Sequence, residues 1–102
     1  MNYDLSELRP FLDGNGRLVS FPAKHRKKLL ALWYLSGKIE SDRQYSEPEI
    51  NDLLDDWAVF HDHATLRREL YNKELLERTA DCKCYRKAES IPPLDEFINK
   101  YI

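Results

Sequence analysis

The sequence has few cysteines and no long hydrophobic run. Its two cysteines, Cys82 and Cys84, are separated by one residue, so a disulfide between them would close a ring too small to gain much loop entropy. No run of about 18 apolar residues is present, so we expect no membrane-spanning helix. The first residues lack the basic stretch and apolar run of a signal peptide. Together these absences predict a cytoplasmic protein with reduced thiols.

An excess of basic charge is also absent. Sixteen Lys and Arg residues stand against 18 Asp and Glu residues, which gives a net charge of −2 and a pI near 5.9. Proteins that bind nucleic acid without sequence preference are usually basic overall, so we expect no strong attraction of that kind. A local basic patch is still compatible with this balance, because acidic groups beyond a Debye length have little effect on it.

The chain is nevertheless a typical globular sequence. Hydrophobic residues make up 42% and charged residues 33% of it, which excludes an intrinsically disordered composition. Its 102 residues are enough for one small domain with a single core, which we place over residues 1–102.

No combination of nucleophile, base and orienting group is apparent, so we expect neither an enzyme nor a cofactor. His61-Asp62-His63 resembles part of a metal-dependent hydrolase motif, but the further ligands are lacking, and Asp62 is better explained as a helix N-cap. A weaker alternative is a metal or redox site formed by Cys82 and Cys84 with His61 or His63, although the spacing is unlike that of zinc fingers. On a strand, both thiols would point to one face.

Hydrophobic periodicity predicts helices separated by short strands. Apolar residues recur at helical spacing in residues 4–12, 22–35, 47–57, 62–72 and 94–101. Pro22 suits the first turn of the second helix, and Ser46 with Glu49 predicts a capping box at the start of the third. Short strands are expected at residues 17–21, within 39–45, at 75–79 and at 83–86.

This order of elements predicts an α+β fold. We expect a mainly helical, winged helix-turn-helix-like domain with a small antiparallel β-hairpin as its wing. Residues 62–72 would form the recognition helix and residues 75–86 the wing. Short terminal helices, at about 4–12 and 94–101, would flank this unit.

Three separated motifs resemble the bacterial family called domain of unknown function 2087. They read FLDGNGRLVSFPAK, YSEPEIN and HDHATLRREL, and the matching positions are Phe11, Leu12, Asp13, Gly16, Arg17, Leu18, Pro22, Lys24, Tyr45, Glu47, Glu49, Asn51, His61, Asp62, Leu66, Arg67, Arg68 and Leu70. Some members of this family carry the domain behind an ArsR-like helix-turn-helix, so the resemblance implies a regulatory context. It implies no activity or ligand. The Cys82-Lys83-Cys84 segment departs from the family pattern.

Three groups of polar residues are candidates for contacts with nucleic acid. On the helix 62–72 they are Thr65, Arg67, Arg68 and Asn72, whose side chains are of types that bind base edges or phosphates. In the basic run at residues 24–28 they are Lys24, Arg26 and Lys27; cations at a helix start oppose its dipole, which suggests another use for their charge. On the wing they are Lys83 and Arg86.

Each group also has a plain structural explanation. The basic run and the helix face could be ordinary solvated surfaces, and Arg67 and Arg68 could orient loops by pairing with Glu47, Glu49 or Asp13. We therefore expect a small bacterial nucleic-acid-binding protein with a regulatory role and DNA or RNA as partner. The alternative is a protein-interaction module on the same scaffold without nucleic-acid binding.

The terminal segments carry apolar stripes that are too short to be stable alone. Leu5, Leu8 and Phe11 form the first stripe, and Phe97 and Ile98 belong to the second. They must pack on the core of their own chain or on a partner chain, so a homodimer is a further hypothesis.

Overall fold

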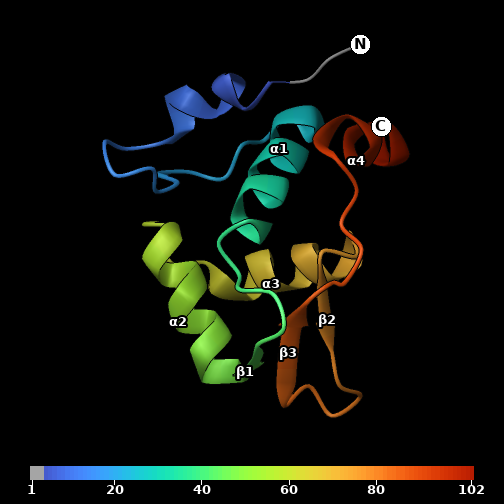
Figure 1. The fold of residues 1–102 in the computed structure, drawn as a ribbon. Helices are drawn as coiled ribbons and strands as arrows, with labels where there is room; N and C mark the ends of the chain where they lie inside the picture. Colours follow the sequence, from blue (N-terminus) through green and yellow to red (C-terminus); the bar gives the residue numbers. More distant parts are fainter. Residues whose placement is uncertain (1–3) are drawn as a thin grey trace.

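A computed structural model describes residues 4–102, so the first three residues of the expected domain 1–102 lie outside the described residues. Helices make up about half of the chain, and the strands form one small antiparallel sheet, which makes the fold α+β. In chain order the elements are η1 (Leu5–Phe11), α1 (His25–Ser36), β1 (Gln44–Ser46), α2 (Glu47–Trp57), α3 (His63–Asn72), β2 (Leu76–Arg78), β3 (Cys84–Lys87) and α4 (Leu94–Tyr101) (Figure 1).

The sheet pairs β1 with β3 and β3 with β2, so that β3 is the central strand. Tyr85 of β3 lies opposite both Tyr45 of β1 and Arg78 of β2. Side chains alternate between the two faces of a sheet, so these three residues share one face. Tyr45 and Tyr85 are buried, which identifies that face as the one packed on the helices.

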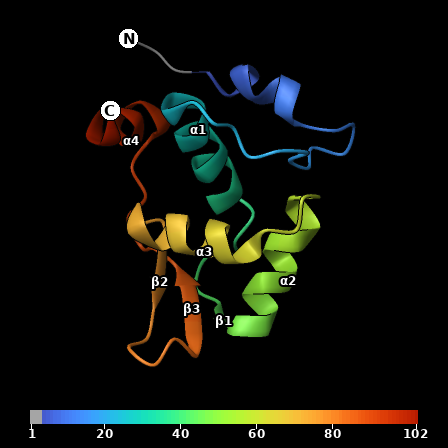
Figure 2. The ribbon, with the colours of Figure 1, turned by 180° about the vertical axis from the view of Figure 1, so that it is seen from behind.

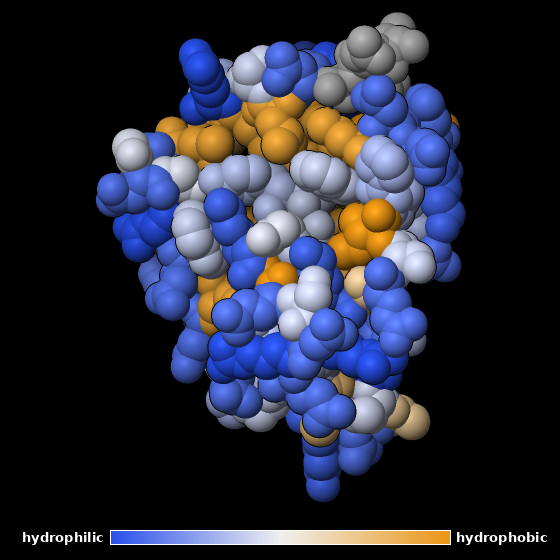
Figure 3. All heavy atoms as spheres, in the orientation of Figure 1, coloured by the Kyte–Doolittle hydropathy of each residue, from blue (hydrophilic) through white to orange (hydrophobic). Residues whose placement is uncertain are grey.

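The core is built mainly on α1, where Leu29, Leu30, Leu32 and Leu35 are fully buried. Leucines of α2 and α3 and hydrophobic residues of η1 and α4 join the same cluster. On the face shown in Figure 3, hydrophobic residues gather in the upper part, over η1, α1 and α4, and the lower part over the sheet is mainly hydrophilic.

The apolar stripes of both terminal helices pack on the core of their own chain. Leu8 of η1 and Phe97 and Ile98 of α4 are buried against it without any partner chain. The stripes therefore give no support to the expected homodimer. Among residues 4–102, no helix has the length and apolar content needed to cross a membrane.

The N-terminal third departs from the sequence-based expectation. The first helix is a 3-10 helix that contains Pro10, and α1 begins at His25 rather than Pro22 because Lys24 has extended backbone angles. The expected strand 17–21 is wrong: it is reduced to single bridges of Leu18 with Leu12 and Ala58. In the bridge to Ala58, the Leu18 N–H donates to the Trp57 carbonyl and the Leu18 carbonyl accepts from the Val59 N–H, contacts with a distant segment that local pattern does not reveal.

The ends of α2 and α3 follow local rules more closely. Asp62 caps α3 by accepting a hydrogen bond from the Thr65 N–H, as expected. At the end of α3, Glu74 adopts the left-handed conformation (φ 61°). Leu75 N–H then reaches the Leu70 carbonyl at 2.9 Å, which closes the helix in a Schellman motif.

The capping box at α2 is confirmed. The Glu49 N–H donates to Ser46 Oγ at 3.3 Å, and the Ser46 N–H donates to Glu49 Oε1 at 2.8 Å. The Ser46 backbone donor lowers the pKa of the Glu49 carboxyl below its usual value.

Ser46→Ala is expected to lower the free energy of unfolding by about 1 kcal/mol, because one N–H of the first turn loses its acceptor. Urea denaturation followed by circular dichroism measures this change. Ser41→Ala, at an exposed position outside the helix, is the matched control and should change stability by less than about 0.5 kcal/mol. Equal stabilities of the two variants would show that the box contributes nothing.

Candidate nucleic-acid interface

A concave groove of about 450 Å³ lies between α3 and the β2–β3 hairpin. Figure 2 shows α3 lying across the upper ends of the two strands, with the hairpin extending below it. The groove is lined by side chains from α2, α3, both strands and the hairpin turn: Glu47, Ala64, Arg67, Arg68, Tyr71, Asn72, Arg78, Cys82 and Tyr85. Three of these side chains are guanidiniums and only one is a carboxylate.

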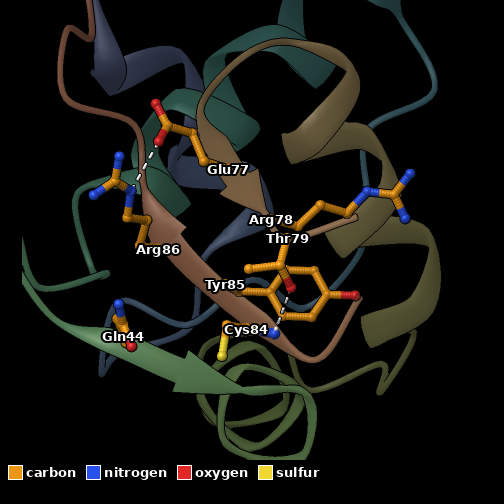
Figure 4. A pocket seen from close by; sticks show the side chains of 7 residues that line it. All are labelled: Gln44, Glu77, Arg78, Thr79, Cys84, Tyr85 and Arg86. Atoms are coloured by element: carbon orange, nitrogen blue, oxygen red, sulfur yellow. Dashed lines mark hydrogen bonds and ion pairs between the residues drawn. The ribbon is translucent and has the colours of Figure 1, made fainter. Parts of the chain in front are cut away.

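The arginines come from two elements, and each element explains their position. Arg67 and Arg68 follow the buried Leu66 on α3, one helical turn before the buried Leu70. Arg78 is the last residue of β2, and its pairing with Tyr85 places it on the sheet face that meets α3. Figure 4 shows Arg78 and Tyr85 pointing to the same side of the hairpin.

Arg67 is held by several partners at once. Its guanidinium donates to Asn51 Oδ1, lies 3.6 Å from Glu47 Oε1, and stands 5.7 Å from the centre of the Tyr85 ring. Its side chain is only 21% exposed. Arg67 therefore joins α3 to α2 and the sheet, and this structural role is the alternative that the sequence left open.

Arg68 is in the opposite situation. Its side chain is exposed and has no hydrogen-bond or ion-pair partner among residues 4–102. Asn72, one turn further along α3, is also exposed and lines the same groove. Thr65 is half-buried next to the cap of α3 and does not line the groove, so it is not brought together with them.

Arg78 and Tyr71 form the wall of the groove on the hairpin side. The guanidinium carbon of Arg78 lies 4.3 Å from the centre of the Tyr71 ring, and its Nη1 contacts the sulfur of Cys82. Tyr71 is 40% exposed, which is unusual for so large a side chain in this domain. A guanidinium stacked on a ring keeps its outer donors available for an anion.

The hairpin tip next to the groove is fixed by local hydrogen bonds. The Asp81 carboxylate accepts from the Thr79 hydroxyl at 2.6 Å and from the Lys83 N–H at 3.1 Å. The Thr79 hydroxyl is the main cause of the lowered pKa of Asp81. On the strand itself, burial raises the pKa of Tyr85, so its phenol stays protonated and can donate a hydrogen bond near neutral pH.

Comparison with protein families gives one match: the family described as "Uncharacterized protein conserved in bacteria (DUF2087)" matches residues 17–87. The chain belongs to this family. No curated protein and no solved structure matches it. The DUF2087 region extends from before α1 to the end of β3, so it contains every residue of the groove and excludes η1 and α4.

The basic run of this DUF2087 domain lies away from the groove. It occupies the start of α1, which Figure 1 shows at the opposite end of the molecule from the hairpin tip. Arg26 pairs with Glu7 of η1, Lys27 lies over the Phe11 ring at 5.8 Å, and His25 Nε2 donates to the Tyr101 carbonyl at 2.7 Å. These contacts attach both terminal helices to α1, and only Lys24 is exposed without such a contact.

Arg86 also lies away from the groove, on the open face of the sheet. It pairs with Glu77 at 2.9 Å and with Glu89 at 3.5 Å. Figure 4 shows the Glu77 pair on the side of the hairpin opposite the Tyr85 ring, next to a shallow hollow that Gln44 also lines. The other expected wing residue, Lys83, is exposed at the tip and does not line the groove.

The weaker metal alternative is not supported by the geometry. His61 and His63 both approach Asp55 of α2, at 3.7 and 3.0 Å, far from the hairpin tip. Within residues 4–102, no group of three or more His, Cys, Asp and Glu side chains is arranged to hold a metal ion. Cys82 precedes β3 with a left-handed backbone (φ 60°), so strand alternation does not align it with Cys84.

The groove residues that were not among the sequence-based candidates for nucleic-acid contacts include Tyr71, Arg78 and Tyr85. A signal for two of them was present. Leu76 is buried, so period-two alternation along β2 places Arg78 on the same face, and the apolar Tyr85 indicates the inward face of β3. Nothing in the sequence indicates that Tyr71 is exposed.

Proposed function

We propose that the domain is a winged helix-turn-helix that binds nucleic acid in the groove between α3 and the hairpin. The order α1–β1–α2–α3–β2–β3 and the sheet order β1-β3-β2 support the fold assignment. In this assignment α3 is the recognition helix and the β2–β3 hairpin is the wing. A regulatory role in bacteria is supported by the family resemblance, which implies that some members carry the domain behind an ArsR-like helix-turn-helix.

The excess of positive charge in the groove carries the proposal. Three guanidiniums converge there with Glu47 as the only carboxylate, although the whole chain has a net charge of −2. Like charges at short range repel one another, and the repulsion is relieved when an anion binds between them. Phosphates are the anions that arginine binds best, through bidentate hydrogen bonds. A phosphate backbone therefore suits this groove.

The proposal is tested by measuring binding to labelled DNA and RNA as a function of salt concentration, using fluorescence anisotropy. Affinity should fall steeply as salt rises, because bound cations release counterions from the phosphates. Arg68→Ala should weaken binding about tenfold, as expected for one lost charged hydrogen bond.

Arg86→Ala is the matched control for Arg68→Ala. It also removes one arginine charge, but from β3 on the open face of the sheet, and should leave affinity almost unchanged. Equal losses in the two variants would contradict a groove-specific contact. Absence of binding to any DNA or RNA at low salt would overturn the proposed function and favour a protein-interaction module instead.

A further inference from the structure

We propose that the groove binds an unpaired strand, with one base stacked on Tyr71 and its phosphates held by Arg68 and Arg78. The ligand class is single-stranded DNA or RNA rather than a duplex. This inference rests on the proposed function, since it names the form of nucleic acid that the same groove accepts.

The shape of the site favours a single strand. Reading a duplex requires a protruding helix face to enter a major groove about 12 Å wide. The arginines here line a concave space of about 450 Å³ between α3 and the hairpin. That volume lies in the range that holds small ligands, and it admits one or two nucleotides but no base-paired helix.

Tyr71 provides a stacking surface at the edge of this space. Its ring is 40% exposed, and the Arg78 guanidinium lies 4.3 Å from the ring centre. Aromatic rings and guanidinium planes are the surfaces on which unpaired bases stack in proteins that bind single strands. Paired bases within a duplex are already stacked on their neighbours and cannot use such a surface without being flipped out.

Acidic residues beside the groove oppose the second strand of a duplex. In helix-turn-helix proteins the helix before the recognition helix crosses the phosphate backbone. Here that helix is α2, and its first turn carries Glu47 and Glu49. Glu47 lines the groove, and Asp52 is exposed one turn further on. A single strand in the groove meets Glu47, which pairs with Arg67 at 3.6 Å, whereas a duplex that crosses α2 would also bring phosphates towards Glu49 and Asp52.

The test compares labelled probes of about 10 nucleotides, a length typical of single-strand binding sites. The probes are a DNA strand, an RNA strand of the same sequence, the DNA duplex, and an abasic DNA strand that has phosphates but no bases. Anisotropy is measured over a range of salt concentrations. At least one of the two single strands should bind about tenfold more tightly than the duplex, and the abasic strand should bind about tenfold more weakly than the tighter of the two single strands. Which of the two strands binds more tightly identifies the source of the ligand.

Two variants separate stacking from charge. Tyr71→Leu should weaken single-strand binding about tenfold while the salt dependence stays as in the wild type, because no phosphate contact is lost. Tyr71→Phe keeps the ring and should bind almost as the wild type does. Three results would overturn the inference. They are a duplex that binds as tightly as the tighter of the two single strands, an abasic strand that binds as tightly as that strand, and a Tyr71→Leu variant whose affinity for that strand is unchanged. If the duplex binds and Arg68→Ala weakens that binding, the proposed function remains in place and only the preference for a single strand is overturned. If no probe binds, the proposed function and the preference for a single strand are both overturned.

Discussion

Replacing Arg68 and Arg78 together by alanine is expected to weaken nucleic-acid binding about 100-fold at moderate salt. In the proposed complex each arginine supplies a charged hydrogen bond to phosphate, and the loss of each is expected to lower affinity about tenfold. The two side chains come from α3 and β2, on the two sides of the groove, so their losses should add. The slope of affinity against salt concentration should also fall by the equivalent of about two phosphate contacts.

The double variant Arg26→Ala, Arg86→Ala is the control for this experiment. It removes the same total charge, but from the start of α1 and from the open face of the sheet. Its affinity should change by no more than about twofold, because both guanidiniums are paired with carboxylates and neither lines the groove. If both double variants lose affinity equally, binding follows the net charge of the protein and does not take place in the groove.

Arg67→Ala is expected to lower the free energy of unfolding by about 2 kcal/mol. The substitution leaves Asn51 and Glu47 without their partner and removes the guanidinium that lies beside the Tyr85 ring. Hydrogen bonds to charged groups at half-buried positions typically contribute this much. Urea denaturation of the variant, analysed as a two-state transition, gives the value.

The neighbouring arginine is the matched control for this prediction. Arg68→Ala should change stability by less than about 0.5 kcal/mol, because its side chain is exposed and unpaired within residues 4–102. Adjacent arginines would thus divide into one that stabilises the fold and one that binds the ligand. Equal stabilities of the two variants would contradict the role assigned to Arg67.

Features that depend on neighbouring residues could be predicted from the sequence. The Ser46–Glu49 capping box and the Asp62 cap are formed within four residues, and both are present. The end of α2 at Trp57 was predicted from two carboxylates near the helix end, and it is also confirmed.

Features that depend on distant contacts could not be predicted. The basic run was interpreted as a phosphate-binding surface because its charges oppose the helix dipole. In the structure Arg26 and Lys27 instead attach η1 to α1, through Glu7 and Phe11. These partners are adjacent only after folding, so no local pattern distinguishes the two uses of the charge.

The two arginines of α3 illustrate the same limit within the site. Arg67 and Arg68 are neighbours of identical chemistry. The helical period places Arg68 opposite Leu66 and Leu70 and Arg67 at the flank of that buried face, but it does not reveal what either side chain contacts. Their contacts differ, because Arg67 donates a hydrogen bond to Asn51 of α2 whereas Arg68 is exposed. That contact depends on how α2 packs against α3. Sequence reasoning therefore identified α3 as the helix of the candidate site but could not predict the contacts of its two arginines.

The central claim is that nucleic acid binds between α3 and the hairpin. A ¹H–¹⁵N NMR titration of the protein with a short oligonucleotide tests it most directly, because each backbone amide reports on its own surroundings. The account predicts that the shifted amides gather at residues 64–72 and 78–85, which include all the groove residues except Glu47. Shifts that gather instead at the start of α1 or on the open face of the sheet, or no shifts at low salt, would contradict it.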